Sequence, residues 1–449
     1  MPFITSPEWY GHCPRLGEGI ESPLRVRMVL LLCAALVSGA CLNSGAFAQS
    51  STAKIPTTGR ANPQLASFDH LFVGFLHERQ LPGGASLAVA RNGRLVYARG
   101  YGYADEETKE PVQSNSLFRI ASISKPLTAV AILQLVERGR LRLNDSVFDV
   151  LQLQEPAGND VTFDERWRRV TILHLLQHRG GWDRDKSFDP MFHSRAIVKE
   201  LKIEPPARPR DIIRYMLRHP LDFNPGARDV YSNFGYCLLG RVIEKVSGQS
   251  YEQYVRKEVL APLGIHDMRV GATLLEKRAP HEVRYHVGKN ALAPAVMGPH
   301  LGEKVPWPYG AWCLESMDSH GGWLASASDL VRFASAFYDP RRCKILSAKS
   351  IAILFARPPG AAGIDDKGKP RDAFYACGWM VRPIDDNGGR NIWHGGYLDG
   401  TSTLLVNRND GLTWAVLFNS SKKTKKELPA DAIDSLMHEA ADAVEVWPR

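Results

Sequence analysis

Three stretches of the chain place a serine three residues before a lysine, a spacing that can pair a nucleophilic hydroxyl with its base. They begin at Ser51, Ser122 and Ser420. Residues three apart lie on one face of a helix, and burial lowers the pKa of a lysine so that its amine can take the serine proton. Acyl transfer needs this pair together with hydrogen-bond donors for the oxyanion.

Sequence context selects the copy at Ser122. Residues 127–136 are apolar on almost every side and Gly139 ends the run, which predicts a buried helix from Ser122 to Gly139. The other two copies lie in a leader-like segment and in a lysine-rich loop. We therefore predict Ser122 as nucleophile and Lys125 as base. Taken alone, the same letters also fit a serine at a helix N-terminus and a lysine that extends its charge to solvent.

A second polar motif is Tyr231-Ser232-Asn233, the only Tyr-x-Asn in the chain, which precedes a predicted helix from Phe234. A phenol in such a loop can pass a proton to a leaving group, and the Asn233 amide can bind both Lys125 and a substrate carbonyl. A half-buried tyrosine above an asparagine helix cap would give the same letters.

A third motif, His-Gly-Gly, occurs twice. The triplet at His320 runs into a predicted helix capped by Ser326, whereas the triplet at His394 ends an apolar strand and is followed by two more strands. Because glycines let a substrate approach a strand edge, we assign His394, Gly395 and Gly396 to substrate binding.

The order of these motifs resembles that of the serine β-lactamase and penicillin-binding-protein superfamily, specifically its class C-like branch of β-lactamases, esterases and D-amino-acid peptidases. That order is Ser-x-x-Lys, Tyr-x-Asn, and a Lys/His-x-Gly triplet on a strand before two closing strands. The likeness extends to Phe118-Arg119-Ile120-Ala121 and to residues 171–178, and it covers nearly the whole mature chain.

The resemblance implies a role for each candidate residue. Ser122, Lys125 and Tyr231 would be catalytic, with Asn233 and His394 positioning the substrate. The backbone N–H groups of Ser122 and Tyr397 would form the oxyanion hole.

One departure from the β-lactamases affects the expected substrate. Those enzymes usually carry Lys-Thr-Gly or Lys-Ser-Gly where this chain has the triplet at His394. An imidazole that is neutral much of the time makes a weaker, pH-dependent contact with an anion. We therefore expect a serine hydrolase that forms an acyl-enzyme with short-chain esters, D-amino-acid peptides or β-lactam-like substrates. The alternative is a catalytically silent receptor for penicillin or cell-wall peptides with the same fold.

The predicted elements indicate an α+β fold. A helix over 63–78 precedes a hairpin over 85–101, which turns at Asn92-Gly93. Helices dominate the middle of the chain, and four strands and a closing helix over 431–444 follow. We expect an antiparallel β-sheet built from both chain ends and flanked by the terminal helices, with a large, mostly helical domain inserted.

The predicted boundaries follow from these elements. A flexible leader over 49–63, rich in Ser, Thr, Ala and Pro, precedes a single catalytic unit over 64–445. Its α/β part comprises 64–117 and 374–445, and the helical insertion covers about 118–373.

Residues 1–48 are predicted to be a signal and targeting region. Arg25 precedes a short apolar run from Met28, and Ala46-Phe47-Ala48 provides a cleavage site. The run falls short of the ~20 apolar residues of a membrane-spanning helix, so we expect no transmembrane helix. Met28 could be the true start. Secretion or export to the periplasm is favoured over a lipoprotein anchored through Cys41, because Ser38 stands where lipidation signals usually have Leu.

The composition is typical of a soluble globular protein, with 44% hydrophobic and 23% charged residues. The formal charge is +8, but Lys and Arg are scattered, and the densest run, over 422–426, reads as a surface loop. We expect a small-molecule or peptide substrate and no nucleic-acid partner. The oligomeric state stays open.

No cofactor or metal is predicted. His174 and His178 have a spacing that zinc ligands can have, but no third ligand accompanies them, which favours a packing or helix-end role. Acidic residues at 183, 185 and 189 are expected to form a solvated loop. Four cysteines of the mature chain could form disulfides in an oxidising compartment, with three pairings open: Cys237, Cys313, Cys343 and Cys377.

Overall fold

The computed structural model describes residues 54–157, 162–288, 290–385 and 388–448. The predicted signal region and the Ser51 motif's serine lie outside the described residues. No helix in the described part of the chain is long and apolar enough to span a membrane.

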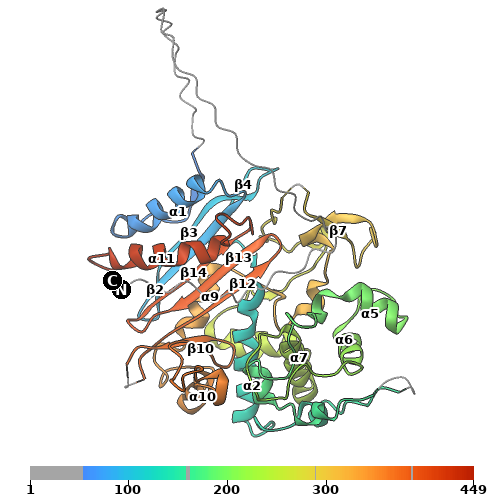
Figure 1. Cartoon of the computed structure of the whole chain (residues 1–449). Coiled ribbons are helices and arrows are strands. Elements are labelled where there is room, and N and C mark those ends of the chain that lie inside the picture. The colour runs from blue at the N-terminus through green and yellow to red at the C-terminus, as the bar shows by residue number, and fades with distance from the viewer. Residues whose placement is uncertain (1–53, 158–161, 289, 386–387, 449) are drawn as a thin grey trace, which may run out of the picture. The chain divides into compact units, whose positions relative to one another are not determined.

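A large antiparallel sheet lies at the centre of the fold (Figure 1), with strand order β1-β3-β2-β14-β13-β12-β11-β10 and with β4 beside β3. Four strands come from the N-terminal part: β1 (Thr57–Thr58), β2 (Gly84–Arg91), β3 (Arg94–Asp105) and β4 (Glu110–Pro111). Five come from the C-terminal part: β10 (Phe374–Tyr375), β11 (Met380–Pro383), β12 (Arg390–Leu398), β13 (Thr401–Asn407) and β14 (Leu412–Phe418). The two parts join where β2 pairs with β14, which confirms a sheet built from both chain ends.

Two terminal helices cover one face of this sheet: α1 (Ala66–Glu78) and α11 (Pro429–Asp442). Their apolar sides pack onto the sheet; Phe72 of α1, for example, stacks on Tyr101 of β3 with ring centroids 4.9 Å apart. On the other face, α9 (Ala327–Ser335) packs against β2 and β14. Ser326 caps α9 by accepting a hydrogen bond from the Asp329 N–H, as its sequence predicts.

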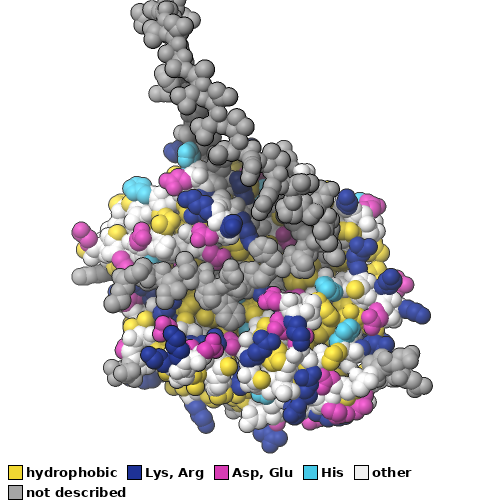
Figure 2. Space-filling view, in the orientation of Figure 1, with side chains coloured by type: hydrophobic (Ala, Val, Ile, Leu, Met, Phe, Trp, Pro, Cys, Tyr) yellow, Lys and Arg dark blue, Asp and Glu magenta, His cyan; other side chains and the backbone are white. Residues whose placement is uncertain are grey.

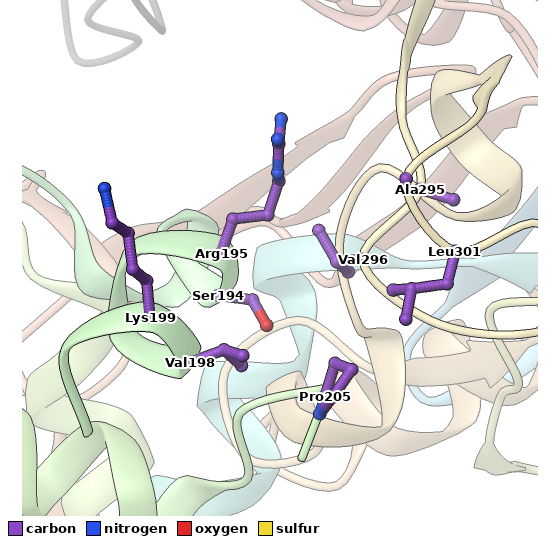
Figure 3. Close-up of a pocket in the computed structure, with 9 residues that line it drawn as sticks. Ser194, Arg195, Val198, Lys199, Pro205, Ala295, Val296 and Leu301 are labelled. Atoms are coloured by element: carbon purple, nitrogen blue, oxygen red, sulfur yellow. The ribbon is translucent and has the colours of Figure 1, made fainter. Parts of the chain in front are cut away.

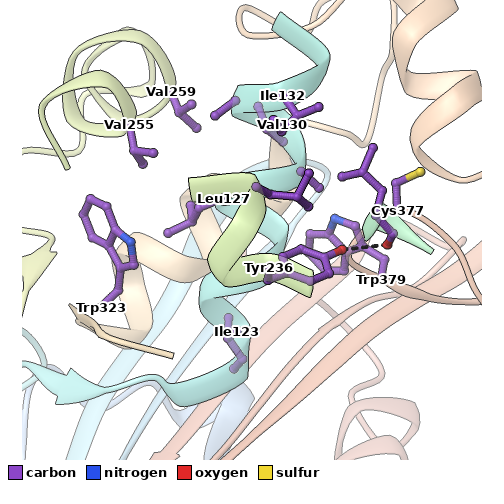
Figure 4. Close-up of a cluster of buried hydrophobic side chains, with 14 of the residues drawn as sticks. Ile123, Leu127, Val130, Ile132, Tyr236, Val255, Val259, Trp323, Cys377 and Trp379 are labelled. Atoms are coloured by element: carbon purple, nitrogen blue, oxygen red, sulfur yellow. Dashed lines mark hydrogen bonds between the residues drawn. The ribbon is translucent and has the colours of Figure 1, made fainter. Parts of the chain in front are cut away.

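The helix that follows the candidate nucleophile is buried on all sides. It is α2 (Ser124–Glu137), preceded by a 3-10 turn over Ala121–Ile123. Its side chains from Ser124 to Leu135 are buried, which is why its sequence shows no polar face. Figure 4 shows Leu127 and Val130 of this helix among side chains of neighbouring segments, including Tyr236 and Trp323.

The middle of the chain contains the remaining helices and two small sheets. The helices are α3 (Val147–Val150), α4 (Ile172–Leu176), α5 (Ser194–Leu201), α6 (Pro209–Met216), α7 (Asn233–Ser247), α8 (Tyr251–Tyr254) and α10 (Ala348–Leu354). One small sheet has the order β5 (Phe118–Arg119), β9 (Trp323–Ala325) and β6 (Arg269–Val270), and the other pairs β7 (Leu292–Pro294) with β8 (Lys304–Pro306). The insertion is therefore mostly helical but also contains short strands.

Two further details concern the leader and the cysteines. The leader expected to be flexible contributes β1, whose Thr57 and Thr58 pair with β3. The four cysteines for which disulfides were considered are all free, and Cys237, Cys313 and Cys377 are buried. Burial raises the pKa of the Cys377 thiol to about 12, so it remains a neutral apolar side chain.

Candidate active site

Ser122 lies in the 3-10 turn that leads into α2, between two sheets. The preceding residue, Ala121, has a left-handed backbone (φ 48°), a conformation that is costly for a residue other than glycine. Both sides of the turn hold it in place: the Ile120 N–H donates to the carbonyl of Trp323 on β9, and the Ile120 carbonyl accepts from Thr403 Oγ1 on β13. The fold therefore fixes the direction of the Ser122 hydroxyl.

Lys125 is fully buried and directs its amine at three acceptors. Nζ lies 3.1 Å from Ser122 Oγ, 2.8 Å from Asn233 Oδ1 and 3.0 Å from the carbonyl oxygen of His320. These three acceptors match the three donors of an ammonium group. Burial nevertheless holds the Lys125 pKa well below its ordinary value, which makes the neutral amine accessible and places a base beside the serine.

Tyr231 also lies close to the Lys125 amine. Lys125 Nζ is 4.6 Å from the centroid of the Tyr231 ring. Burial raises the pKa of Tyr231, and a hydrogen bond with the Ser122 side chain opposes that rise. Tyr231 is therefore a neutral phenol at ordinary pH, with a proton to give and a contact to Ser122.

Asn233 is the first residue of α7, whose helix cap is Ser232: the Ser232 hydroxyl accepts from the Gly235 N–H. The Asn233 side chain is thus free of the capping role that its position also suggested. Its amide group donates from Nδ2 to Asp189 Oδ2 at 2.7 Å, while Oδ1 faces Lys125. Because a carboxylate only accepts hydrogen bonds, Asp189 fixes which end of the amide faces the lysine.

This contact corrects the prediction of a solvated acidic loop. Asp189 is half-buried and binds both Asn233 and the Met191 N–H, and Asp183 is buried and paired with Arg228. Asp185 is exposed, as expected. The sequence Asp-Pro does indicate a cap for the following 3-10 turn, Pro190–Phe192. Only the packing of that turn against α7 brings the second carboxylate oxygen to Asn233.

His394 lies on β12, where both ring nitrogens are engaged within the fold. Nδ1 donates to the Gly395 carbonyl at 2.6 Å, which leaves Nε2 to accept from the Tyr375 hydroxyl at 3.1 Å. Burial, reinforced by the Lys125 charge, lowers the pKa of His394 to about 3. The imidazole is therefore neutral at ordinary pH. The sequence led us to expect a pH-dependent contact with an anion, but the imidazole becomes charged only at a pH below the range in which enzymes usually work.

The glycine at 396 allows β12 to touch the nucleophile turn. A Cβ atom there would lie 2.3 Å from the Ile120 carbonyl oxygen and 3.2 Å from the Ala121 Cβ. Strand β11 pairs with β12 only as far as Trp393, so the edge of β12 from His394 onward faces the Ser122 turn instead of a strand. The next residue, Tyr397, continues along this edge.

Sequence reasoning missed two further histidines of the site. The His-Gly-Gly triplet at His320 contacts Lys125 through the His320 carbonyl. The triplet is followed by β9, and β9 pairs with β5 just before Ser122, which brings the two segments together. His178 packs its ring 4.3 Å from that of Tyr231, and its Nδ1 accepts from the Ser232 N–H. Burial keeps both imidazoles neutral by lowering their pKa values well below the ordinary one.

His174 has the helix-end role that its sequence suggested. It completes a capping box with Thr171 at the start of α4. Within the described ranges no group of three or more His, Cys, Asp or Glu residues could hold a metal ion.

Other surface features lie apart from these motifs. A cavity of about 220 Å³ between α5 and the segment around β7 (Figure 3) contains none of the motif residues in its lining. On the face shown in Figure 2, Lys and Arg side chains are dispersed among Asp and Glu and form no continuous basic patch.

Comparison with known proteins identifies the family and the fold. The sequence profile described as Beta-lactamase matches residues 68–436, most of the chain. The chain belongs to the Beta-lactamase family. Among curated members, it is 30% identical over 362 residues to penicillin-binding protein 4* of Bacillus subtilis, covering 78% of this chain and 71% of that protein. It is 33% identical over 250 residues to esterase EstB of Burkholderia gladioli, covering 55% of this chain and 59% of the esterase.

Solved structures of other proteins share the fold. The octameric penicillin-binding protein homologue from Pyrococcus abyssi superimposes with a TM-score of 0.61 at 27% identity, over 84% of this chain and 77% of the other. The D-amino acid amidase from Ochrobactrum anthropi superimposes with a TM-score of 0.63 at 21% identity, over 86% and 99% of the two chains. These likenesses confirm the α+β serine β-lactamase and penicillin-binding-protein fold expected from the motifs.

Proposed function

We propose that this protein is an exported serine hydrolase that works through an acyl-enzyme on ester or amide substrates. The observation that carries the proposal is the buried Lys125 amine, 3.1 Å from the Ser122 hydroxyl and lowered in pKa by burial. A neutral lysine amine beside a serine hydroxyl can take the hydroxyl proton, and it thereby activates the serine as a nucleophile. A sequence relative named as an esterase and a structural neighbour named as a D-amino acid amidase support the reaction class.

In the proposed acylation step, Lys125 takes the proton of Ser122 as Oγ attacks the substrate carbonyl carbon. Negative charge develops on the carbonyl oxygen, which the backbone N–H groups of Ser122 and Tyr397 bind. Tyr231 gives its proton to the leaving group and recovers one from Lys125. Asn233 holds Lys125 and directs the substrate.

Deacylation uses the same groups in reverse order. A water molecule loses its proton to the Tyr231 and Lys125 pair, attacks the acyl carbon, and expels Ser122, which regains a proton. His394, held neutral, lines the strand edge through which the substrate approaches. A neutral group in that position supports esters and amides over substrates that depend on a strand lysine to bind their carboxylate.

Covalent labelling tests the nucleophile. Purified wild-type protein should react with a fluorophosphonate probe and hydrolyse p-nitrophenyl butyrate, and Ser122→Ala should do neither. Ser420→Ala is the matched control, because Ser420 begins a Ser-x-x-Lys motif of identical spacing. Equal labelling of wild type and Ser122→Ala would refute the assignment. A protein that is labelled at Ser122 but turns over neither esters, nitrocefin nor D-alanyl peptides would be the silent receptor instead.

Export is tested by processing. The full chain expressed in a Gram-negative host should appear in the periplasm or medium with an N-terminus at Gln49, after Ala48. Retention in the cytoplasm at full mass would contradict export, and a lipid-modified N-terminus at Cys41 would show anchoring.

A further inference from the structure

The candidate site has no cation at the strand position where the β-lactamases usually carry lysine. His394 stands there, with its ring nitrogens bound to Gly395 and Tyr375. Lys125 is committed to Ser122, Asn233 and the His320 carbonyl. A substrate anion would therefore need its positive partner from another element.

Arg184 supplies a cation from the loop between α4 and α5. Its guanidinium carbon lies over the Tyr231 ring, 5.0 Å from the centroid. Lys125 Nζ is 4.6 Å from the same centroid, so the two cations are less than about 10 Å apart. Arg184 is half-buried. Because Lys125 Nζ is itself 3.1 Å from Ser122 Oγ, a small substrate bound at Ser122 can span the separation to Arg184.

The loop that carries Arg184 is folded into a defined turn. The Asp183 carbonyl accepts hydrogen bonds from the backbone N–H groups of Lys186 and Ser187, and the Asp183 carboxylate pairs with Arg228. The Ser187 hydroxyl donates to Asp222. The loop therefore presents Arg184 from a fixed backbone.

The charge of Arg184 acts on the reacting groups. It lowers the pKa values of Lys125, His178 and Tyr231, three groups on different elements around Ser122. The carboxylate that opposes it at Lys125 is Asp189, which is held by Asn233 and the Met191 N–H. A guanidinium offers five N–H donors in a planar fork that matches a carboxylate, and such charge-assisted pairs are stronger than neutral hydrogen bonds.

We propose that Arg184 binds an anionic group of the substrate, so that the preferred substrates are esters or amides that carry a carboxylate a few bonds from the reacting carbonyl. This specificity rests on the proposed hydrolase function. Arg184, which lies over the Tyr231 ring, would take the place of the missing strand cation as a substrate-binding residue.

Two p-nitrophenyl esters with five-carbon acyl chains test this specificity. The glutarate monoester carries a terminal carboxylate, and the pentanoate ester is its neutral match. We expect wild type to prefer the glutarate ester, and Arg184→Gln to lose at least about tenfold more kcat/KM on the glutarate ester than on the pentanoate ester, mainly through KM. Lys186→Gln, an equal charge change on the same loop, should keep the preference. Equal losses on both esters would overturn the proposal, because Arg184 would then act only through Tyr231.

A binding measurement separates this inference from the hydrolase proposal. Calorimetry should show that wild type binds phenylacetate more tightly than phenylacetamide and that Arg184→Gln loses the difference. If neither ester is hydrolysed but this difference is found, the hydrolase proposal fails and the anion site stands. If Ser122-dependent hydrolysis occurs but wild type shows no Arg184-dependent preference in either experiment, the anion site is refuted alone.

Discussion

At the scale of single residues, the chemistry depends on how far burial moves the Lys125 pKa. Burial disfavours the ammonium ion and is the largest influence on that pKa; the charge of Asp189 raises it and that of Arg184 lowers it. The nearby imidazoles of His178, His320 and His394 are neutral, so they add no charge at ordinary pH. Asp189 also orients Asn233, which makes it a positioning residue for the base.

Asp189→Asn should move the pH profile in a defined direction. Loss of the negative charge lowers the Lys125 pKa further, so the neutral amine persists to lower pH, and the acid limb of kcat/KM should shift to lower pH. Asn233 also loses its fixed orientation, so kcat should fall about tenfold.

The profile is measured with p-nitrophenyl butyrate from pH 4 to 9. Asp185→Asn is the matched control, because Asp185 lies exposed on the same loop. An acid limb that stays in place or moves upward in Asp189→Asn would contradict the charge effect on Lys125, and an unchanged kcat would contradict the positioning role.

At the scale of elements, the site forms where β12 meets the turn before α2. The turn is held by β9 through Ile120 and by β13 through Thr403. Gly396 allows the contact, since a Cβ there would lie 2.2 Å from Thr403 Oγ1 and 2.3 Å from the Ile120 carbonyl oxygen. The strand and the turn would have to separate to admit even a methyl group.

Gly396→Ala should therefore impair the reaction more than the fold. Overpacking of this kind costs about 1 to 3 kcal/mol of unfolding free energy, and a displacement of the strand edge near 1 Å lowers kcat by about 100-fold. Ester turnover and urea unfolding together measure the two effects.

Gly74→Ala provides the contrast within the same chain. Gly74 lies inside α1, where an added Cβ would have no atom within 4 Å. It should leave kcat unchanged and raise stability by up to about 1 kcal/mol, because alanine favours the helix. Full activity of Gly396→Ala would show that the strand edge does not contribute to the reaction.

At the scale of the whole molecule, the fold buries several histidines and keeps them neutral. His394 binds its proton only near pH 3 in the folded state, compared with an ordinary value of 6.5. Between these values the unfolded chain binds more protons, so stability falls as pH falls. Asp431 and Asp434 of α11 act in the opposite direction, because their pKa values are raised to about 6.

His394→Gln should reduce the loss of stability in acid. The free energy of unfolding should drop less between pH 7 and pH 5 in the variant than in wild type, by as much as about 2 kcal/mol. Urea unfolding at the two pH values measures the difference, and comparison of slopes removes any constant effect of the substitution. His300→Gln, at an exposed position, should behave as wild type. Identical pH dependence in His394→Gln would mean that this imidazole is not held neutral.

Local pattern was enough to predict much of this protein. The all-apolar run after Lys125 predicted a buried helix, and the Asn92-Gly93 turn predicted the hairpin of β2 and β3. The motifs at Ser122, Tyr231 and His394 could be placed in one site because their order resembles that of a known family. Such features are encoded by side chains near one another in sequence.

Tertiary structure decided the features that depend on distant contacts. Asp189 resembled a solvated acid in sequence, and the packing of its turn against α7 made it the partner of Asn233. Pairing of β9 with β5 carried the unassigned His320 triplet to Lys125. Burial keeps His394 neutral, whereas its identity as a histidine in the sequence leaves its charge open. Sequence specifies which groups are present, whereas their charge and orientation depend on the dielectric environment and the neighbours that folding gives them.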